Sequence, residues 1–257
     1  MSMTLRNPDA AAEPGWRSVA WAVLNAVQFG FTCAWTAGGI VLALLLQAFT
    51  GNTALALRMA ARCWAPGLIT GAGGRLRVEG ADAIDWSQPY LLVANHQSVI
   101  DICALFAAVP KPLRFLLKQE MTGWPMVGWY AVRTGMLFID RDNPRAAPTM
   151  LRAATALLAD GHSLCVFPEG TRSRTGELAE FKAGPFTAAI KAAVAVLPVA
   201  VHGAGAVLPP DSLFRVRPGT IRLRFGTPIP AETVRGLDRQ QLAQLAQARV
   251  QAMLEQP

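Results

Sequence analysis

Charge is missing from a long stretch near the start of this chain. No Asp, Glu, Lys or Arg occurs in residues 18–57, although 16% of the 257 residues are charged. The run is too long for a signal peptide, whose apolar core has about 7 to 15 residues. It is long enough for one membrane-spanning helix of about 20 residues, or for two helices that form a hairpin. We therefore expect this segment to associate with a membrane.

A turn signal at Gly51-Asn52 favours the hairpin. We expect a first helix over residues 18–48 and a second over 53–64, closed by Pro66-Gly67. Residues 1–70 would then form a membrane-associating segment that either crosses the bilayer or inserts into one leaflet. Tryptophan favours the headgroup level of a bilayer, and three tryptophans lie near the ends of the segment: Trp16, Trp21 and Trp64.

Cysteine is scarce, and no two of the four cysteines have the C-x-x-C spacing of a zinc or redox site. Each lies in an apolar stretch of sequence. We therefore expect small buried side chains in a reducing compartment, with no disulfide and no metal site. The four are Cys33, Cys63, Cys103 and Cys165. A reducing compartment indicates that the catalytic part faces the cytoplasm.

Acidic residues are fewer than basic ones, which leaves a formal charge of +7. Nucleic acid is not the indicated partner, because no basic helix with interleaved stacking aromatics occurs. Beside a membrane-seeking segment, Lys and Arg are expected to lie against anionic lipid, at about 1 kcal/mol per residue. The same charge would attract phosphorylated substrates or an acidic carrier protein.

After the glycine-rich residues 71–74, short β-type runs alternate with helix-type segments. This alternation predicts one α/β domain over residues 71–257, with a mixed, largely parallel sheet flanked by helices. The predicted strands cover residues 76–79 at an edge, 90–94, 113–117, 136–139, 163–167, 194–201 and 221–225, and the predicted helices cover 100–108, 146–159 and 238–254. Glycine, proline and tryptophan break the pattern at 122–130.

Histidine is also rare, with three in the chain, and one of them has a carboxylate at a useful spacing. His96 follows the buried run 90–94, and Asp101 lies five positions later. On one helix the two side chains would be about 140° apart. We therefore expect His96 in the loop and Asp101 in the first turns of the helix, where the carboxylate orients a histidine base. Free N–H groups at that helix start could stabilise an oxyanion. An isolated pair of this kind is also common by chance.

No conventional nucleophile accompanies this pair. The stretch Gly-His-Ser-Leu-Cys at 161–165 resembles the G-x-S-x-G hydrolase turn, but Cys165 replaces its last glycine and a strand follows. A lipid hydrolase that uses Ser98 or Ser163 stays open as an alternative. A base without a nucleophile favours direct transfer, in which the hydroxyl of the substrate attacks.

Residues 167–174, Phe-Pro-Glu-Gly-Thr-Arg-Ser-Arg, follow a buried strand at the sheet edge where open α/β sheets bind ligands. Arg172 and Arg174 can hold a phosphate. Glu169 would bind a substrate hydroxyl or orient an arginine. The alternative is an ordinary turn with solvated arginines. Three further basic residues are candidates that would each, alone, be typical surface charges: Arg141, Lys118 and Lys182.

Four blocks occur in the order and spacing of the glycerolipid acyltransferases: N-H-x4-D at 95–101, G-M-L-F-I-D-R at 135–141, the stretch 167–174, and V-L-P-V at 196–199. Residues 75–225 resemble most closely the 1-acyl-glycerol-3-phosphate acyltransferases, which make phosphatidic acid. The resemblance implies a general base at His96, oriented by Asp101. It also implies that block 196–199 lies near the acyl or acceptor groove.

The resemblance further implies a substrate-binding set around the phosphoglycerol group. Its members are Glu169, Gly170, Thr171, Arg172, Arg141, Lys118 and Lys182. The N-terminal hairpin is similar to the membrane-seating element of some bacterial members. This similarity implies a place on the cytoplasmic face of the bacterial inner membrane.

The expected reaction transfers an acyl group from acyl-CoA or an acylated carrier protein to the sn-2 hydroxyl of lysophosphatidic acid. No metal or cofactor is expected, because a thioester is already activated. Glycerol-3-phosphate or a lyso-aminolipid stays open as the acceptor. A non-catalytic module that binds lipid phosphates is a further alternative, although such a module has no use for a base.

Overall fold

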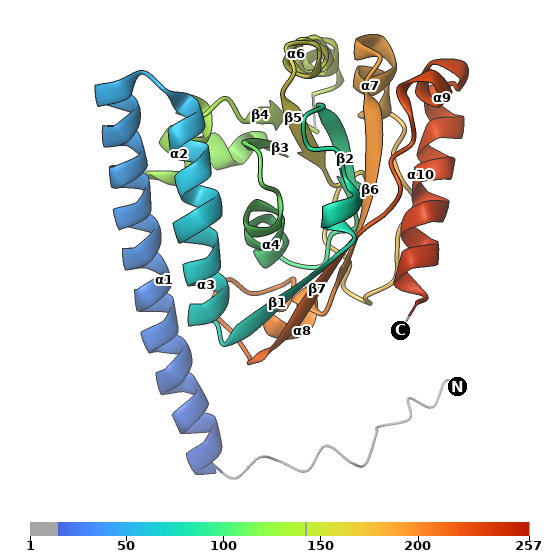
Figure 1. The fold of residues 1–257 in the computed structure, drawn as a ribbon. Helices are drawn as coiled ribbons and strands as arrows, with labels where there is room; N and C mark the ends of the chain where they lie inside the picture. Colours follow the sequence, from blue (N-terminus) through green and yellow to red (C-terminus); the bar gives the residue numbers. More distant parts are fainter. Residues whose placement is uncertain (1–14, 142, 257) are drawn as a thin grey trace, which may run out of the picture.

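The N-terminal part of the protein is a helical hairpin (Figure 1). The structure, a computed structural model, describes residues 15–141 and 143–256. Helix α1 spans Gly15–Thr50 and helix α2 spans Thr53–Met59. Asn52 caps α2, because its side-chain oxygen accepts a hydrogen bond from the Ala54 N–H at 2.9 Å. The predicted hairpin is confirmed.

The second arm of the hairpin does not end at Pro66-Gly67, so that part of the prediction is wrong. A π-helical turn, Ala60–Trp64, follows α2 and leads into helix α3, Ala65–Gly71. Pro66 lies in the first turn of α3, directly after the π-helical turn. The helical arm therefore continues up to the first strand.

Two expectations about side chains of the hairpin are also wrong. The indole of Trp64 points inward, because its Nε1 donates to Thr36 Oγ1 at 3.1 Å and its ring packs edge-on against Phe106. Cys33 and Cys63 are exposed, whereas the other two cysteines are buried. The side chain of Trp16 lies outside the described residues.

The described residues form a seven-stranded sheet in the order β1-β7-β6-β2-β5-β3-β4. Its strands are β1 Gly74–Glu79, β2 Tyr90–Ala94, β3 Leu113–Lys118, β4 Leu137–Ile139, β5 Ser163–Val166, β6 Ala195–His202 and β7 Gly219–Phe225. Strands β6 and β7 pair antiparallel, and the other ladders are parallel. The mixed, largely parallel sheet is therefore confirmed, with β1 at an edge.

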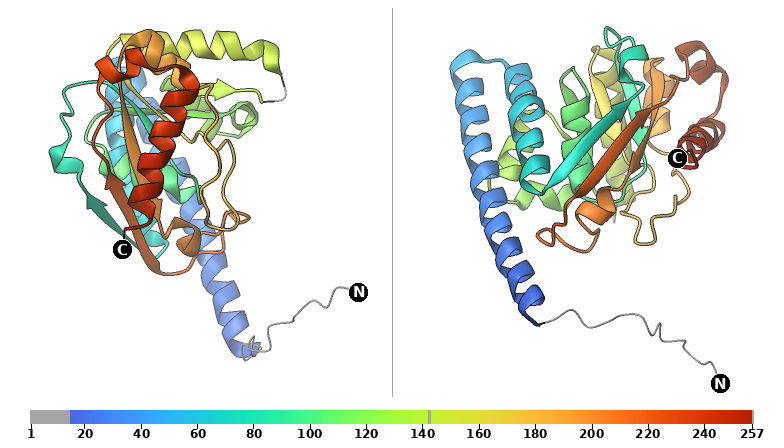
Figure 2. Two further views of the ribbon diagram at one scale, coloured as in Figure 1. Left: turned by 90° about the vertical axis from the view of Figure 1, so that its right-hand side faces the viewer. Right: turned by 60° about the horizontal axis from the view of Figure 1, so that its bottom comes forward.

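Helices cover both faces of the sheet (Figures 1 and 2). Besides the hairpin, they are α4 Ile100–Ala108, α5 Val127–Arg133, α6 Ala147–Ala159, α7 Phe186–Ala192, α8 Ala204–Val207, α9 Ala231–Gly236 and α10 Arg239–Leu254. Short 3-10 turns occupy Ala81–Ala83, Gln119–Gly123 and Pro144–Ala146. Helix α5 begins inside the stretch 122–130 that was predicted to be broken and continues past it, because Pro125 precedes the helix and Gly128 is buried within it.

The central strands are buried on both sides, which explains their continuous apolar sequences. In β2, Leu92 and Ala94 belong to one core with α3, α4 and α5. Leu91 and Val93 belong to a second core with α6, α7, α9 and α10. Both cores hold the carboxyl end of β2 rigidly, and the chain leaves the sheet there toward α4.

Candidate active site

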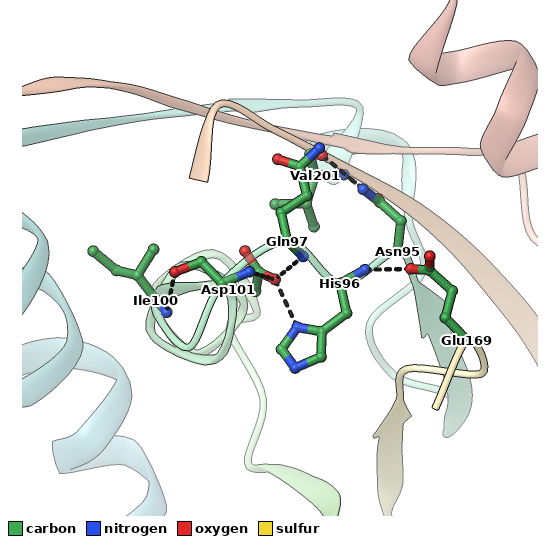
Figure 3. A network of polar contacts seen from close by, with 8 residues as sticks. Asn95, His96, Gln97, Ile100, Asp101, Glu169 and Val201 are labelled. Atoms are coloured by element: carbon green, nitrogen blue, oxygen red, sulfur yellow. Dashed lines mark hydrogen bonds and ion pairs between the residues drawn. The ribbon is translucent and has the colours of Figure 1, made fainter. Parts of the chain in front are cut away.

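His96 lies in the loop between β2 and α4, and Asp101 lies in the first turn of α4. The His96 Nδ1 atom is 2.7 Å from Asp101 Oδ2 (Figure 3). Asp101 is completely buried, whereas the imidazole is partly exposed. The other ring nitrogen, Nε2, points away from the carboxylate. A neutral imidazole held in this way presents Nε2 as a proton acceptor.

A single oxygen of Asp101 serves three donors. Besides the imidazole, Oδ2 accepts the backbone N–H groups of Gln97 at 2.7 Å and Ser98 at 2.8 Å. The N–H of Ile100 donates to the Ser98 hydroxyl at 3.3 Å. These three N–H groups are therefore engaged and are not free to stabilise an oxyanion. The Asp101 Oδ1 atom is buried without a hydrogen-bond partner among the described residues.

Phe167 supports the imidazole from one side. The two rings stack with centroids 3.9 Å apart and planes inclined by 14°. Phe167 directly follows β5, the strand next to β2, which brings the stretch 167–174 beside His96. No role was predicted for this phenylalanine from the sequence. Phe167 comes first in the stretch 167–174, directly after a buried strand, and this position was the signal that could have indicated a role in the site.

Glu169 faces the backbone, and each of its two carboxylate oxygens accepts a backbone N–H rather than an arginine. Its Oε1 accepts the His96 N–H at 2.6 Å, and its Oε2 accepts the Ala179 N–H at 2.9 Å. Burial raises the pKa of the Glu169 carboxyl, although the hydrogen bonds from Ala179 and His96 act in the opposite direction. Glu169 therefore positions the loop that carries His96, and its contact with a substrate stays a prediction.

The remaining residues of the 167–174 stretch surround the same loop. The Ser173 N–H donates to the His96 carbonyl at 2.8 Å, which joins the two motifs. Gly170 has a φ of +79°, and the flexible end of Lys182 lies across its α-carbon. Arg172 is half-buried, whereas Thr171 and Arg174 are exposed. Arg172 thus lies on a segment tied directly to the His96 loop, and Lys182 is tied to that segment through the Pro168 carbonyl.

Lys118 and Arg141 lie at the same edge of the sheet but farther along it. Lys118 is the last residue of β3 and Arg141 follows β4, and β5 separates those strands from β2. Lys118 forms an exposed ion pair with Glu120 at 2.9 Å. The pKa of Glu120 is lowered first by a backbone hydrogen bond and by Lys118, with a smaller effect from the charge of Arg141. The structure therefore groups these two basic residues with each other.

The fourth block is not part of the site surface. Residues 196–199 form the middle of β6 and are fully buried between β2 and β7. Strand β6 supports the start of the loop that carries His96: the Asn95 side chain donates to the Val201 carbonyl at 2.9 Å and accepts its N–H at 2.7 Å. Block 196–199 does not line the apolar cavity, and its place near the acyl or acceptor groove stays a prediction.

An apolar cavity of about 430 Å³ begins beside the catalytic loop. Val99 and Ile100, at the start of α4, line its inner end together with Phe115, whose ring stacks on Phe167. Its other walls come from α1, α3 and α5. Trp124 and Leu213 line the cavity and are also exposed, so it reaches the surface there. The cavity could not be predicted from the sequence, because its walls come from segments far apart in the chain.

The serines considered for a hydrolase are poorly placed. Ser98 is completely buried. Ser163 begins β5, at the end of the strand away from Phe167, and its hydroxyl accepts the Tyr90 N–H at 3.1 Å. Neither can act as a nucleophile activated by His96. In the part of the chain that the structure describes, no three His, Cys, Asp or Glu side chains gather as metal ligands would.

The chain is similar to known acyltransferases in both sequence and structure. The family model described as Acyltransferase matches residues 75–202. A 1-acyl-sn-glycerol-3-phosphate acyltransferase of Chlamydomonas reinhardtii is 32% identical over 89% of this chain and 69% of its own length. A lyso-ornithine lipid O-acyltransferase of Pseudomonas aeruginosa is 34% identical, over 75% and 77% respectively. The crystal structure of the LPA acyltransferase PlsC from Thermotoga maritima has a TM-score of 0.80 at 25% identity, covering 93% of this chain and 96% of that one.

The fold and the family match together define the class, an α/β acyltransferase whose His96–Asp101 pair lies at the carboxyl edge of the sheet. The matched residues contain all four sequence blocks. The sequence identity to the Chlamydomonas reinhardtii enzyme, and the share of that enzyme covered, show the family. The chain belongs to the 1-acyl-sn-glycerol-3-phosphate acyltransferase family.

Proposed function

We propose that this enzyme transfers an acyl group from an acyl thioester to the sn-2 hydroxyl of 1-acyl-glycerol-3-phosphate, giving phosphatidic acid. The observation that carries the proposal is the open Nε2 of His96, held by a buried carboxylate at 2.7 Å beside an apolar cavity. The names of the relatives support the acceptor, because several are 1-acyl-sn-glycerol-3-phosphate acyltransferases.

His96 takes the proton from the acceptor hydroxyl as that oxygen attacks the thioester carbonyl. A new C–O bond forms, the C–S bond breaks, and the proton passes from the imidazolium to the leaving thiolate. Asp101 stabilises the imidazolium during this step, as a buried carboxylate does for a histidine base. The reaction needs no cofactor, because the thioester carbonyl is already activated. The donor, acyl-CoA or an acylated carrier protein, is a co-substrate.

Arg172 is proposed to hold the phosphate of the acceptor. It is half-buried on the stretch that Ser173 ties to the His96 carbonyl, so a bound phosphate would place the hydroxyl near the base. Lys182, next to Gly170, would add a second positive charge. Arg141 and Lys118, with Thr171, extend the basic and polar edge, where they would meet the charged parts of either substrate.

The apolar cavity is proposed to hold an acyl chain. Its walls are almost entirely hydrocarbon, and its inner end lies at the loop that carries the base. Such a chain would gain about 25 cal/mol for each Å² of apolar surface removed from water. Binding would thus bring the reacting carbonyl toward His96.

The enzyme is further proposed to work on a membrane, on the cytoplasmic face of a bacterial inner membrane. Residues Val19–Thr50 of α1 are long and apolar enough to cross a bilayer, and only 11% of their most apolar window is buried. Leu45 and Phe49 are among its exposed side chains. A helix that is exposed and apolar favours lipid as its surroundings.

A second acceptor has specific support. A relative that covers three quarters of this chain is named a lyso-ornithine lipid O-acyltransferase. A phosphate-free acceptor would not need Arg172. The lipid hydrolase is not proposed further, because the two serines that it would use are buried away from the imidazole.

The test is an acyl transfer assay with purified protein. A panel of lysolipids would be offered with acyl-CoA and with acylated carrier protein, and the products identified by mass. We expect phosphatidic acid from lysophosphatidic acid. Replacing Arg172 with Gln should raise the KM for lysophosphatidic acid more than tenfold while sparing a phosphate-free lysolipid, because a charged hydrogen bond contributes about 1.5 to 3 kcal/mol. Equal losses with both acceptors would contradict the assigned role.

A further inference from the structure

Exposed apolar side chains occur on the α/β domain as well as on the hairpin. Trp129 and Val132 of α5 are 62% and 57% exposed, and we call them the α5 patch. Leu213 and Phe214, in the segment after α8, are 47% and 51% exposed, and we call them the 214 loop. Single exposed apolar residues are normal. These four are grouped in two pairs, and both pairs adjoin α1.

Direct contacts join each group to a different part of α1. The Gln47 side chain donates to the Arg133 carbonyl at the end of α5, at 2.9 Å. The Asn25 side chain accepts the Val216 N–H at 3.0 Å, and the Phe29 ring packs edge-on against Phe214 with centroids 6.0 Å apart. These contacts lie about 33 Å apart along α1, at 1.5 Å per residue. Phe29 and Gln47 are about five full helical turns apart, so the two groups adjoin the same side of α1 at two heights along the helix.

The apolar surface continues between the two groups. Several large apolar side chains of α1 are exposed along this length, and they include Val27, Phe31, Trp35, Val41, Leu42 and Leu45. The cavity beside the active site reaches the surface in the same region. Three of its lining residues are also exposed: Phe29, Trp124 and Leu213. The opening of the cavity thus lies among α1, the segment before α5 and the 214 loop.

Basic residues border this surface. Arg133 is exposed one residue after Val132, and Arg217 is exposed three residues after Phe214. Arg215 lies nearby but forms an ion pair with Asp211 at 2.6 Å. An apolar surface with arginines at its border matches the boundary between the acyl chains and the anionic headgroups of a bilayer.

We propose that the α5 patch, the 214 loop and the exposed side of α1 form one surface that contacts the bilayer. A single helix anchor leaves rotation about its axis free, whereas additional lipid contacts of the α5 patch and the 214 loop, which lie beside α1, remove that freedom. The opening of the cavity then faces the lipid. The inference rests on the proposed function in one respect, that the enzyme works on a membrane. It adds which residues touch the lipid.

Site-specific fluorescent labels test this surface in the full chain. The exposed thiols are removed first by Cys33→Ser and Cys63→Ser, since the other two cysteines are buried. An environment-sensitive label is then attached to a new cysteine at Trp129 or Phe214. The labelled proteins are mixed with vesicles of phosphatidylcholine and phosphatidylglycerol, with and without a quencher on the acyl chains.

Three further labelled positions make the result decisive. Leu45, exposed on α1, reports attachment of the helix itself. Ala156 on α6 and Gln244 on α10 are exposed on helices that cover the opposite face of the sheet. We expect labels at 45, 129 and 214 to shift to shorter wavelength and lose emission to the quencher. Labels at 156 and 244 should show neither change.

Two outcomes would overturn the proposal. Quenching at 45 without quenching at 129 and 214 would show that only the helix touches lipid. No quenching at any position would remove membrane attachment, and the surface with it. Acyl transfer is assayed separately on the unlabelled protein, so quenching at 129 and 214 without phosphatidic acid synthesis would refute the proposed function and support the surface.

Discussion

Asp101 shows at the scale of one residue how burial and hydrogen bonding prepare a base. Its Oδ2 receives the imidazole and two backbone N–H groups, so the ring, the loop and the first turn of α4 are held by one atom. Removing its charge should leave this geometry largely intact and abolish the stabilisation of the imidazolium.

We therefore expect Asp101→Asn to lower kcat by about 10² to 10⁴, the range that general base catalysis contributes. The KM for lysophosphatidic acid should change little, because Asp101 is buried and faces away from the acceptor. Steady-state kinetics and a circular dichroism spectrum measure both effects. A variant that folds and keeps more than about a tenth of the activity would contradict the role of Asp101.

Glu169 gives a prediction about pH and stability. Its pKa is raised by burial, so the folded protein favours the neutral carboxyl more than the unfolded chain does. The stability from this group is complete below the ordinary carboxyl pKa and is lost as pH rises through the raised value. Glu169→Gln removes this dependence of stability on pH. The glutamine amide has only one oxygen, so either the His96 N–H or the Ala179 N–H then faces its NH₂ group.

The variant should therefore be less stable by about 1 to 3 kcal/mol at low pH. The difference from the wild type should become smaller as pH increases from about 4 toward 7. Urea denaturation in detergent over this pH range measures it. A difference that grows with pH would show that the charged form of Glu169 is the one that the fold prefers.

Residue roles could be predicted from the sequence where the relevant partners are close in the chain. His96 and Asp101 are five positions apart, so helix geometry alone placed one in the loop and the other in the helix. The partners of Glu169 could not be foreseen, because the His96 N–H lies 73 positions away and meets the carboxylate only in the folded sheet. The stacking of Phe167 on His96 depends on the same neighbouring strands.

At the scale of elements, α10 shows how local sequence defines a helix start. The Asp238 side chain accepts the N–H groups of Gln240 and Gln241 at 2.7 and 2.9 Å, and the Gln241 side chain accepts the Asp238 N–H at 3.0 Å. This reciprocal capping box satisfies donors that the helix cannot satisfy itself.

Replacing Asp238 with Ala should destabilise the protein by about 0.5 to 2 kcal/mol. The kcat should be unchanged, because α10 covers the second core and lines no part of the cavity. Chemical denaturation and an activity assay separate the two effects, with the exposed Arg239→Ala as the matched control. No loss of stability relative to that control would contradict the capping role.

Long or continuous apolar elements were predictable, and short ones were not. Strand β2 and helix α4 were predicted at the bounds that the structure has, because one is a continuous apolar run and the other follows it after capping residues. Helices α5, α7, α8 and α9 have at most seven residues, too few for a helical period to stand out. Helix α5 also contains Gly128, which resembles a helix breaker although it allows close packing.

At the scale of the whole molecule, the order of the strands brings the chemistry together. The strand order places β2 beside β5, so the base and the arginine-bearing stretch leave the sheet side by side. Strand alternation predicted a parallel sheet but not this order, which depends on how helices pack on both faces. The cavity was unpredictable for the same reason, since α1, α3, α4 and α5 all contribute to it.

The central claim is that His96 is the base that transfers an acyl group to lysophosphatidic acid. The most direct measurement compares the wild type with His96→Ala, using labelled lysophosphatidic acid and an acyl thioester donor in vesicles. We predict that the variant remains folded and bound to the vesicles but forms phosphatidic acid at least about 100-fold more slowly. Turnover near that of the wild type would contradict the account.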